Sequence, residues 1–241
     1  MDTSGRVFEL WVYLSTSPLT WLTVTIGAYI AAQRLAALSG FNPIVNPVLI
    51  SVVLVISILA ATGTSYSTYF DGAQFVHFAL GPATVALAVP LYRNRTLIRQ
   101  NFVPVIVALI AGSLTAIVCA TGVALLLGAP DSVAISLAPK SATAGIAVGI
   151  SQQLGGDPAL TALFVIFTGV LGAIIVTPLM NLLRIRNYAA RGFAAGLTSH
   201  GIGTARAFQV NEIAGTFSGL AMALNGIFTS AIAAVVLGLL L

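Results

Sequence analysis

Long runs without a charged residue dominate the hydrophobic pattern of the chain. Five stretches contain no Asp, Glu, Lys or Arg, namely residues 10–32, 35–70, 100–130, 158–183 and 213–241. A helix needs roughly 20 apolar residues to cross about 30 Å of hydrocarbon, and each run is long enough. Strands of a membrane β-barrel would be short and alternating, whereas these runs are continuously apolar. The pattern therefore predicts α-helices that span a membrane.

Proline and glycine divide this pattern into about seven or eight membrane segments. Apolar segments near 74–92 and 133–153 are interrupted, by Gly81-Pro82 and by Pro139-Lys140-Ser141. A glycine-rich segment near 188–208 is less hydrophobic. The remaining helices are expected near 9–37, 44–63, 101–128, 158–184 and 213–240. We expect an all-α, polytopic transmembrane bundle with two proline-broken or re-entrant segments, forming one membrane domain over residues 1–241.

Composition and charge agree with a multi-pass protein of the inner (plasma) membrane of a cell. Hydrophobic residues make up 58% of the 241 residues and charged residues only 7%, too few to cover a water-soluble surface. The net charge of +4 does not indicate nucleic acid, because the arginines cluster in short loops that are expected to stay in the cytoplasm. These clusters are Arg93, Arg95 and Arg99, and Arg184, Arg186 and Arg191. The single cysteine, Cys119, is predicted to be a small packing residue.

Two stretches of the chain resemble each other, which suggests an internal repeat. Residues 80–89 and 137–148 both read leucine, a small residue and proline, and then Ala-Thr and a similar apolar run, with two extra residues, Lys140 and Ser141, after the proline of the second stretch. Paired interrupted segments are typical of the binding site of secondary transporters, and inverted repeats are plausible. If helix 101–128 leads out of the cell and helix 158–184 leads back, segment 133–153 starts and ends outside. It would then be a re-entrant hairpin or a broken helix.

Lys140, the only lysine, is the strongest candidate for function. An ammonium group in the middle of a bilayer costs about 2.5–3.5 kcal/mol on insertion scales, so it needs a partner. An anionic substrate, Ser141, Thr143 or backbone carbonyls could supply one, or the side chain could reach the membrane surface. Pro139 could start a half-helix whose free N–H groups favour a carboxylate. Pro82 and Thr84 could form a facing half-helix, unless the prolines only kink their helices.

Three further polar residues complete the predicted site. Arg206 could hold a carboxylate with two parallel hydrogen bonds, or lie at the cytoplasmic interface. His200 could carry a coupling proton, or be a hydrogen-bonded packing residue. Asn225 could bind substrate or hold helices together. The predicted set is Pro82, Thr84, Pro139, Lys140, Ser141, Thr143, His200, Arg206 and Asn225.

Other classes of function lack support in the sequence. The chain has no nucleotide-binding motif and no cluster of metal ligands, so we expect neither a cofactor nor a metal. An enzyme could pair Ser141 with Lys140, or Ser199 with His200. Neighbouring residues of a helix point in different directions, which makes both pairs poor catalytic dyads. We therefore expect a protein that is not an enzyme.

Several strings of residues resemble the LrgB/CidB family of bacterial membrane proteins. That family also resembles the C-terminal part of a plant plastid glycolate/glycerate transporter. The similar strings cover most of the chain after residue 60: Leu80–Tyr92, Pro139-Lys140-Ser141-Ala142-Thr143, Gly155-Gly156-Asp157-Pro158, Thr168-Gly169, His200–Ala207 and Ser218–Met222.

The resemblance implies two different functions. One is a secondary transporter of small monocarboxylates such as glycolate, glycerate or pyruvate. The other is an antiholin-like modulator of murein hydrolase export and cell lysis, acting through oligomers in the membrane. A homo-oligomer such as a dimer, and a small LrgA/CidA-like membrane partner, are expected with either. The intramembrane cations favour the transporter, because a purely regulatory surface gives no reason for a lysine beside a broken helix.

Overall fold

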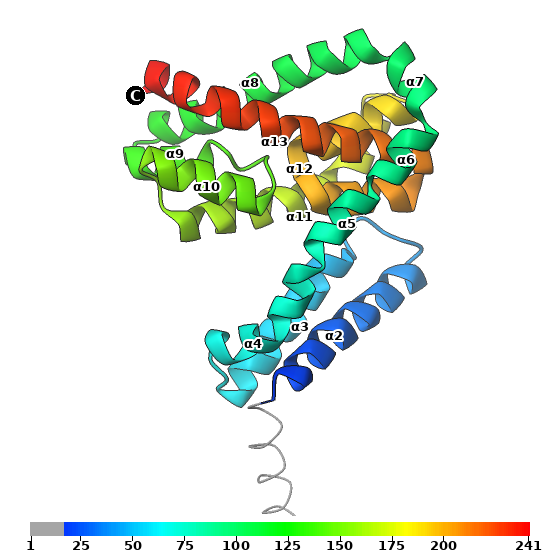
Figure 1. Cartoon of the computed structure of the whole chain (residues 1–241), viewed down its shortest axis with the longest axis vertical. Helices are drawn as coiled ribbons and strands as arrows, with labels where there is room; N and C mark the ends of the chain where they lie inside the picture. Colours follow the sequence, from blue (N-terminus) through cyan, green and yellow to red (C-terminus); the bar gives the residue numbers. More distant parts are fainter. Residues whose placement is uncertain (1–16) are drawn as a thin grey trace, which may run out of the picture. The chain divides into compact units, whose positions relative to one another are not determined.

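A computed structural model describes residues 17–241 and contains α-helices and no strand in that range (Figure 1). The all-helical prediction is therefore confirmed for this part of the chain. The predicted start of the first helix, residues 9–16, lies outside the described residues. The chain forms two compact units, Met1–Ala86 and Leu87–Leu241, which we call unit 1 and unit 2.

The described part of unit 1, residues 17–86, contains four helices that pack through small and aromatic residues. Gly72 lies so close to the backbone of Pro18 that a side chain at this position would collide with it. The fully buried ring of Trp21 meets Tyr69 edge to face, with centroids 6.0 Å apart. The helices are α2 (Pro18–Leu38), α3 (Pro47–Thr62), α4 (Tyr66–Phe78) and α5 (Leu80–Ala86).

Unit 2 is built around the long final helix. Its helices are α6 (Ala88–Arg93), α7 (Arg95–Gln100), α8 (Phe102–Leu126), α9 (Asp131–Leu137), α10 (Ala144–Leu154), α11 (Pro158–Leu182), α12 (Tyr188–Val210) and α13 (Glu212–Leu240). Polar side chains cap several of them: Asp157, Asn187 and Asn211 each accept a hydrogen bond from a backbone N–H in the first turn of the next helix. These caps explain why α11, α12 and α13 begin where the sequence predicts.

Among residues 17–241, five helical stretches are long and apolar enough to cross a membrane. They are Pro18–Leu38, Tyr66–Arg93, Phe102–Leu126, Pro158–Leu182 and Glu212–Leu240. Many of their large apolar side chains are exposed, including Leu19, Ile26, Val107, Phe167 and Ile227. Such extensive apolar surface is tolerated in contact with lipid and not in water. The chain is therefore a membrane protein.

Helices α9 and α10 form a hairpin within unit 2, and the two ends of this hairpin lie on the same side of the unit. Residues 138–143 between them are not helical. After α10 the chain returns to α9. A hydrogen bond shows this contact, in which the backbone N–H of Asp157 donates to Ser136 Oγ at 2.7 Å. Gly156 fits there only because it lacks a side chain, since a Cβ would collide with Ser151 Oγ. This is the geometry expected of a segment that does not cross the membrane.

Helix α12 is also a hairpin, although it is a single helix in the hydrogen-bond pattern. The backbone is not helical at Ser199 and His200, and His200 has a φ of 41°. A Cβ on Gly203 would lie 2.6 Å from the carbonyl oxygen of Ala195. Residues eight apart in a straight helix would be about 12 Å apart. Residues 188–198 and 201–210 therefore fold back against each other.

Helix α12 is thus the second hairpin of unit 2. The predicted interruption near Gly81-Pro82 lies between α4 and α5, and it does not unwind the chain as residues 138–143 do. Pro82 lies near the start of α5, after a single turn at Ala79. Proline is tolerated in a first helical turn, because the N–H that it lacks would have no partner there. The similar strings at residues 80–89 and 137–148 also have different structures, helical in the first and unwound at 138–143 in the second.

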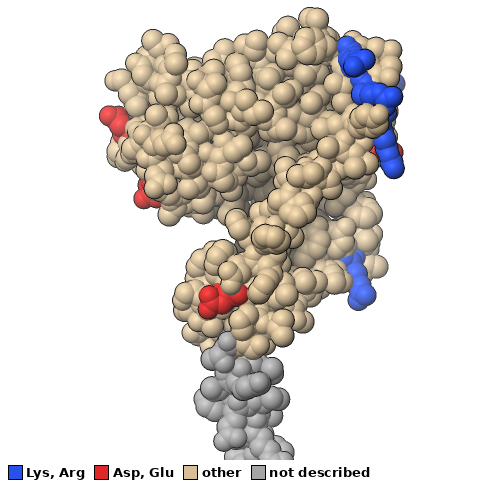
Figure 2. Space-filling model, viewed as in Figure 1, with Lys and Arg blue, Asp and Glu red and all other residues tan. Residues whose placement is uncertain are grey.

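The two hairpins of unit 2 enter from opposite ends of α13. Ala138 packs in a cluster with Val236 and Leu237, near the end of α13. Ala207 of α12 packs with Ala214, near its start. Basic atoms gather along the edge of unit 2 near α6 and α7, and acidic atoms lie at the opposite edge near α9 (Figure 2). This separation agrees with the predicted cytoplasmic location of the arginine clusters at one end of the helices.

Candidate functional site

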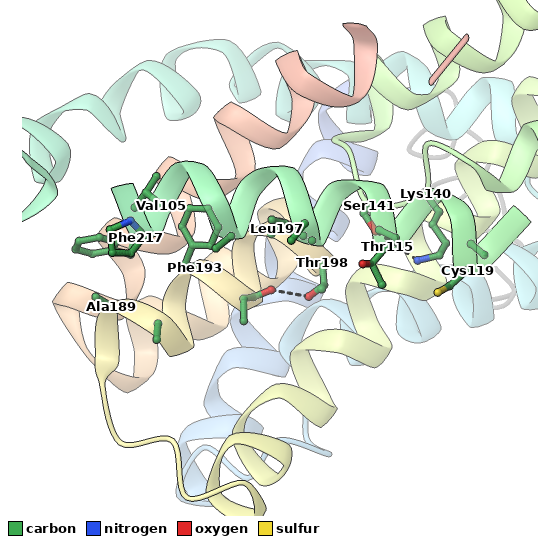
Figure 3. Close-up of a pocket in the computed structure, with 18 of the residues that line it drawn as sticks. Val105, Thr115, Cys119, Lys140, Ser141, Ala189, Phe193, Leu197, Thr198 and Phe217 are labelled. Carbon is green, nitrogen blue, oxygen red and sulfur yellow. Dashed lines mark hydrogen bonds between the residues drawn. The ribbon is translucent and has the colours of Figure 1, made fainter. Parts of the chain in front are cut away.

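A cavity of about 1280 Å³ lies within unit 2, between α8 and the first half of α12 (Figure 3). The turn at residues 138–143 contributes Lys140 and Ser141 to its wall, and α13 contributes Phe217. One side of the cavity is a row of small residues on α8, which are Ala108, Ala111, Gly112, Thr115, Ala116, Cys119 and Ala120. Small side chains on one helix face leave the space that the cavity occupies.

Polar groups gather at one end of the cavity. Lys140, Ser141, Thr115 and Cys119 lie together there, with the lysine side chain directed toward Cys119 (Figure 3). Lys140 Nζ donates only a long hydrogen bond, 3.4 Å, to Ser141 Oγ. No carboxylate lies within salt-bridge distance of this ammonium group among residues 17–241. The cavity therefore contains a cation without a counter-ion.

The rest of the cavity wall is mainly apolar, although Asn101 and Asn187 also border it. Val105, Phe193, Leu197 and Phe217 lie in this part of the wall in Figure 3 and belong to one buried cluster that joins α8, α12 and α13. An apolar wall lowers the local dielectric constant, which strengthens any interaction between Lys140 and an anion. The arrangement suits a ligand with one anionic group and a small carbon skeleton.

Asn225 holds both hairpins at the middle of α13. Its Nδ2 donates to the carbonyl oxygens of Ser141 (3.0 Å) and Leu197 (3.1 Å), one beside the tip of each hairpin. Its Oδ1 accepts from Ser113 Oγ (2.7 Å) and Thr229 Oγ1 (3.2 Å). The amide is fully buried, and these four bonds use its whole hydrogen-bonding capacity. Of the two roles predicted for Asn225, the structure supports the joining of helices.

Pro139 and Thr143 shape the turn beside Lys140. Pro139 is fully buried and is not among the cavity-lining residues, and helix α10 begins at Ala144 rather than at Pro139 as predicted. The tight turn explains the delay, because the backbone N–H of Ala142 donates to the Pro139 carbonyl oxygen. Thr143 precedes α10 with extended backbone and makes no side-chain capping bond. The structure thus places neither side chain in the cavity wall.

His200 lies at the tip of the second hairpin. Its ring is buried, and Nε2 donates to the carbonyl oxygen of Val165 at 3.0 Å. Gly169 of α11 accommodates the ring, since a Cβ there would lie 2.6 Å from His200 Cε1. His200 does not line the cavity. The structure therefore supports the packing role that was one of its two predicted interpretations.

The structure does not bring Arg206 to Lys140. Arg206 lines a second, small pocket between α11, α12 and the start of α13, and it is absent from the wall of the large cavity. Pro82 and Thr84 belong to α5 of unit 1, where both are exposed and the Thr84 hydroxyl donates to the carbonyl oxygen of Leu80. Of the predicted residues, Lys140 and Ser141 share one cavity.

Sequence reasoning missed Thr115 and Cys119 as neighbours of Lys140. They are four residues apart and therefore lie on one face of α8. The recurrence of small residues at this spacing along residues 108–120 was the signal that could have identified the face. The prediction that Cys119 is a packing residue is wrong, because this side chain is exposed and lines the cavity.

The described residues contain no group of three or more His, Cys, Asp or Glu side chains that could bind a metal ion. The contact between Ser141 and Lys140, at 3.4 Å, is longer than the 2.6–3.2 Å expected of a nucleophile and its base. Ser199 Oγ is hydrogen-bonded to Thr198 Oγ1, and the His200 ring is hydrogen-bonded to a backbone carbonyl, so these two side chains do not bond each other. The absence of enzymatic activity stays a prediction.

These features define a polytopic helical membrane protein in which two hairpins meet beside a cavity that is lined by one partly buried lysine, Lys140. Residues 25–239 match the LrgB-like family, and the chain belongs to that family. The predicted resemblance is confirmed.

Curated relatives cover most of the chain. The holin-like protein CidB of Staphylococcus epidermidis is 32% identical over 78% of this chain and 82% of its own length. The holin-like protein CidB of Staphylococcus aureus is 32% identical over 88% of this chain and 92% of its own length. The uncharacterized protein YwbG of Bacillus subtilis is 35% identical over 76% and 82%. No solved structure matches the chain.

Proposed function

We propose that unit 2 binds small organic anions at Lys140 and that the chain is a secondary carrier of small monocarboxylates, of the glycolate, glycerate or pyruvate class. The observation that carries this proposal is the ammonium group of Lys140, which faces an apolar cavity without a carboxylate partner among residues 17–241. A carboxylate would neutralise it. The hydroxyls of Ser141 and Thr115, which line the same end, could bind a hydroxyl or keto oxygen of the substrate.

The two hairpins also support a carrier. Secondary transporters bind substrate near the middle of the bilayer, beside helices that are interrupted there. Asn225 lies near the middle of α13 and bonds both hairpins, so the unwound backbone at residues 138–143 lies at this level. We propose that α3 and the two hairpins join the five candidate spans of residues 17–241 to give eight membrane segments. We propose that the opposed hairpins belong to inverted repeats.

The names of the relatives favour a second function more directly. Two of them are called holin-like proteins, which supports an antiholin-like modulator of murein hydrolase export and cell lysis. Such a protein would act in the inner membrane through homo-oligomers such as dimers, and with a small LrgA/CidA-like membrane partner. Its action would depend on the oligomer and its effect on the bilayer, and not on the ammonium group of Lys140.

One experiment in proteoliposomes separates the two functions. The full chain is reconstituted, and uptake of labelled glycolate and of labelled pyruvate is measured beside the release of a trapped fluorescent dye. A carrier gives saturable uptake, competition by unlabelled monocarboxylates and no dye release. Uptake that never saturates, together with dye release, would support the holin-like function and contradict the carrier. No uptake and no dye release would also contradict the carrier.

A further inference from the structure

Two arginines that are distant in the sequence line one small pocket of unit 2. Arg191 and Arg206 both border a space of about 20 Å³ between α11, α12 and the start of α13. On a straight helix, residues fifteen positions apart would be separated by about 22 Å. They meet because α12 reverses its direction at Ser199 and His200. The hairpin therefore creates a cationic site from two arginines whose spacing in the sequence gives no sign that they are neighbours.

Only neutral groups hydrogen-bond to these two guanidinium groups among residues 17–241. Arg191 Nη2 donates to Asn181 Oδ1 at 2.8 Å and to the carbonyl oxygen of Thr177 at 3.3 Å. Arg206 Nη1 donates to Gln209 Oε1 at 3.3 Å. Arg206 Nε is buried and has no hydrogen-bond partner. A buried, charged donor without an acceptor is costly, so this atom indicates that an anion belongs in the pocket.

We propose that the pocket between Arg191 and Arg206 is a second anion site, distinct from the cavity at Lys140, and that it binds a phosphate group. Guanidinium forks match the oxygens of phosphate, and two of them share its negative charge. The pocket has room for about one or two oxygen-sized atoms, which suits the tip of an oxyanion whose remainder lies outside. Tyr188, which also borders the pocket, can add a hydroxyl donor.

The location of the pocket suggests where the phosphate comes from. Arg191 belongs to the arginine cluster that includes Arg184 and Arg186, at the predicted cytoplasmic end. Basic pockets between helices at that end of membrane proteins bind the headgroups of anionic lipids. Free phosphate offers the same chemistry from the cytoplasm. Both sources use the same two arginines, and titration with each can tell them apart.

The test uses the purified full chain in detergent. Binding is measured by calorimetric titration with mixed micelles that contain phosphatidylglycerol, with micelles of phosphatidylcholine, and with inorganic phosphate alone. The variants are Arg206→Gln and Arg191→Gln. Arg186→Gln is the matched control, because it removes one charge from the same cluster at an exposed residue outside the pocket. Arg206→Lys keeps the positive charge but loses the paired N–H donors of the guanidinium group. It replaces Arg206→Gln in the test if that variant does not fold.

The proposal expects saturable binding that Arg206→Gln and Arg191→Gln each weaken at least tenfold, and Arg186→Gln less than twofold. Binding of phosphatidylglycerol alone would identify a lipid headgroup, and binding of inorganic phosphate would identify a soluble source. The proposal is overturned if neither probe saturates the wild-type chain. It is also overturned if the pocket variants bind as the wild type does, or if Arg186→Gln weakens binding equally. Because Lys140 lies outside this pocket, the result does not depend on the carrier proposal.

Discussion

A single buried amide, Asn225, joins four elements of unit 2. Its bonds reach α8 through Ser113, both hairpins through Ser141 and Leu197, and its own helix through Thr229. Hydrogen bonds between membrane helices contribute about 0.6 kcal/mol each on average. Removing the amide also leaves buried carbonyl and hydroxyl groups without partners. The position of Lys140 therefore depends on a residue that does not contact the cavity.

Asn225→Ala should lower the stability of the protein by about 2 kcal/mol, because several interhelical bonds are lost together. Thermal unfolding in detergent measures the change. Ser230→Ala is a suitable control on the same helix, since its hydroxyl donates only to the carbonyl oxygen of Gly226. Equal effects of the two substitutions would show that Asn225 does not join the hairpins.

Cys119 offers a chemical probe of the cavity, because it is the only cysteine and lies beside Lys140. An anionic thiol reagent should modify it and block uptake, and a saturating monocarboxylate should slow the modification several-fold. The rate of labelling is measured by mass spectrometry. In Cys119→Ser, uptake should no longer respond to the reagent. If substrate leaves the labelling rate unchanged, Cys119 is not beside the bound anion.

At the scale of elements, the second hairpin depends on close contact between backbones. Gly192 and Gly196 of α12 lie against the carbonyl oxygens of Ala214 and Ser218 of α13, with no room for a side chain. Small residues allow membrane helices to approach each other in this way. The first half of α12 therefore runs parallel to α13, since both partners advance by four residues. The turn at Ser199 and His200 then returns the second half beside it.

Gly196→Ala should destabilise the protein by about 1–3 kcal/mol, because the added Cβ collides with a backbone carbonyl that cannot rotate away. Gly122→Ala on α8 is the control, since no atom lies within 4 Å of its added Cβ. That change should be neutral or slightly stabilising, because alanine favours helix over glycine. Thermal unfolding of both variants checks the prediction, and equal stability of Gly196→Ala and the wild type would contradict it.

The elements show which parts of the structure the sequence could predict. The helices predicted at residues 101–128, 158–184 and 213–240 agree with α8, α11 and α13 to within two residues, because a long uncharged apolar run is typical of a helix that spans a membrane. Pro139 correctly marked a break, since proline acts locally. The break at Ser199 could not be predicted, because it depends on Gly169 and Gly172 of α11, which leave space for His200 and Ser199. The prediction that Arg206 shares a site with Lys140 was wrong for a related reason. The turn at Ser199 and His200 directs the second half of α12 back, and Arg206 then lines the small pocket.

At the scale of the whole molecule, we expect the two hairpins to open toward opposite sides of the membrane. The α9–α10 hairpin begins beside Asp131, at the predicted outer end, and α12 begins after the arginines of residues 184–186, at the predicted inner end. This arrangement gives a binding site between the hairpins a route to either side. It is also the arrangement that alternating access needs.

Labelling of single cysteines in intact cells tests this topology. In a Cys119→Ser background, Ser132→Cys should react with a membrane-impermeant maleimide from outside, and Arg186→Cys only after the cells are opened. Both positions are exposed, so the reagent can reach them from the appropriate side. Reaction of both cysteines from the same side would show that the hairpins do not enter from opposite sides.

The proposed carrier depends on the binding of the transported carboxylate to the ammonium group of Lys140. Saturable uptake of labelled glycolate or pyruvate into proteoliposomes, compared between wild type, Lys140→Gln and Lys140→Arg, tests it most directly. We predict that Lys140→Gln lowers uptake at least tenfold, equivalent to about 1.4 kcal/mol or more, and that Lys140→Arg retains part of it. Uptake by Lys140→Gln equal to that of the wild type, in protein that is equally folded and inserted, would contradict the account.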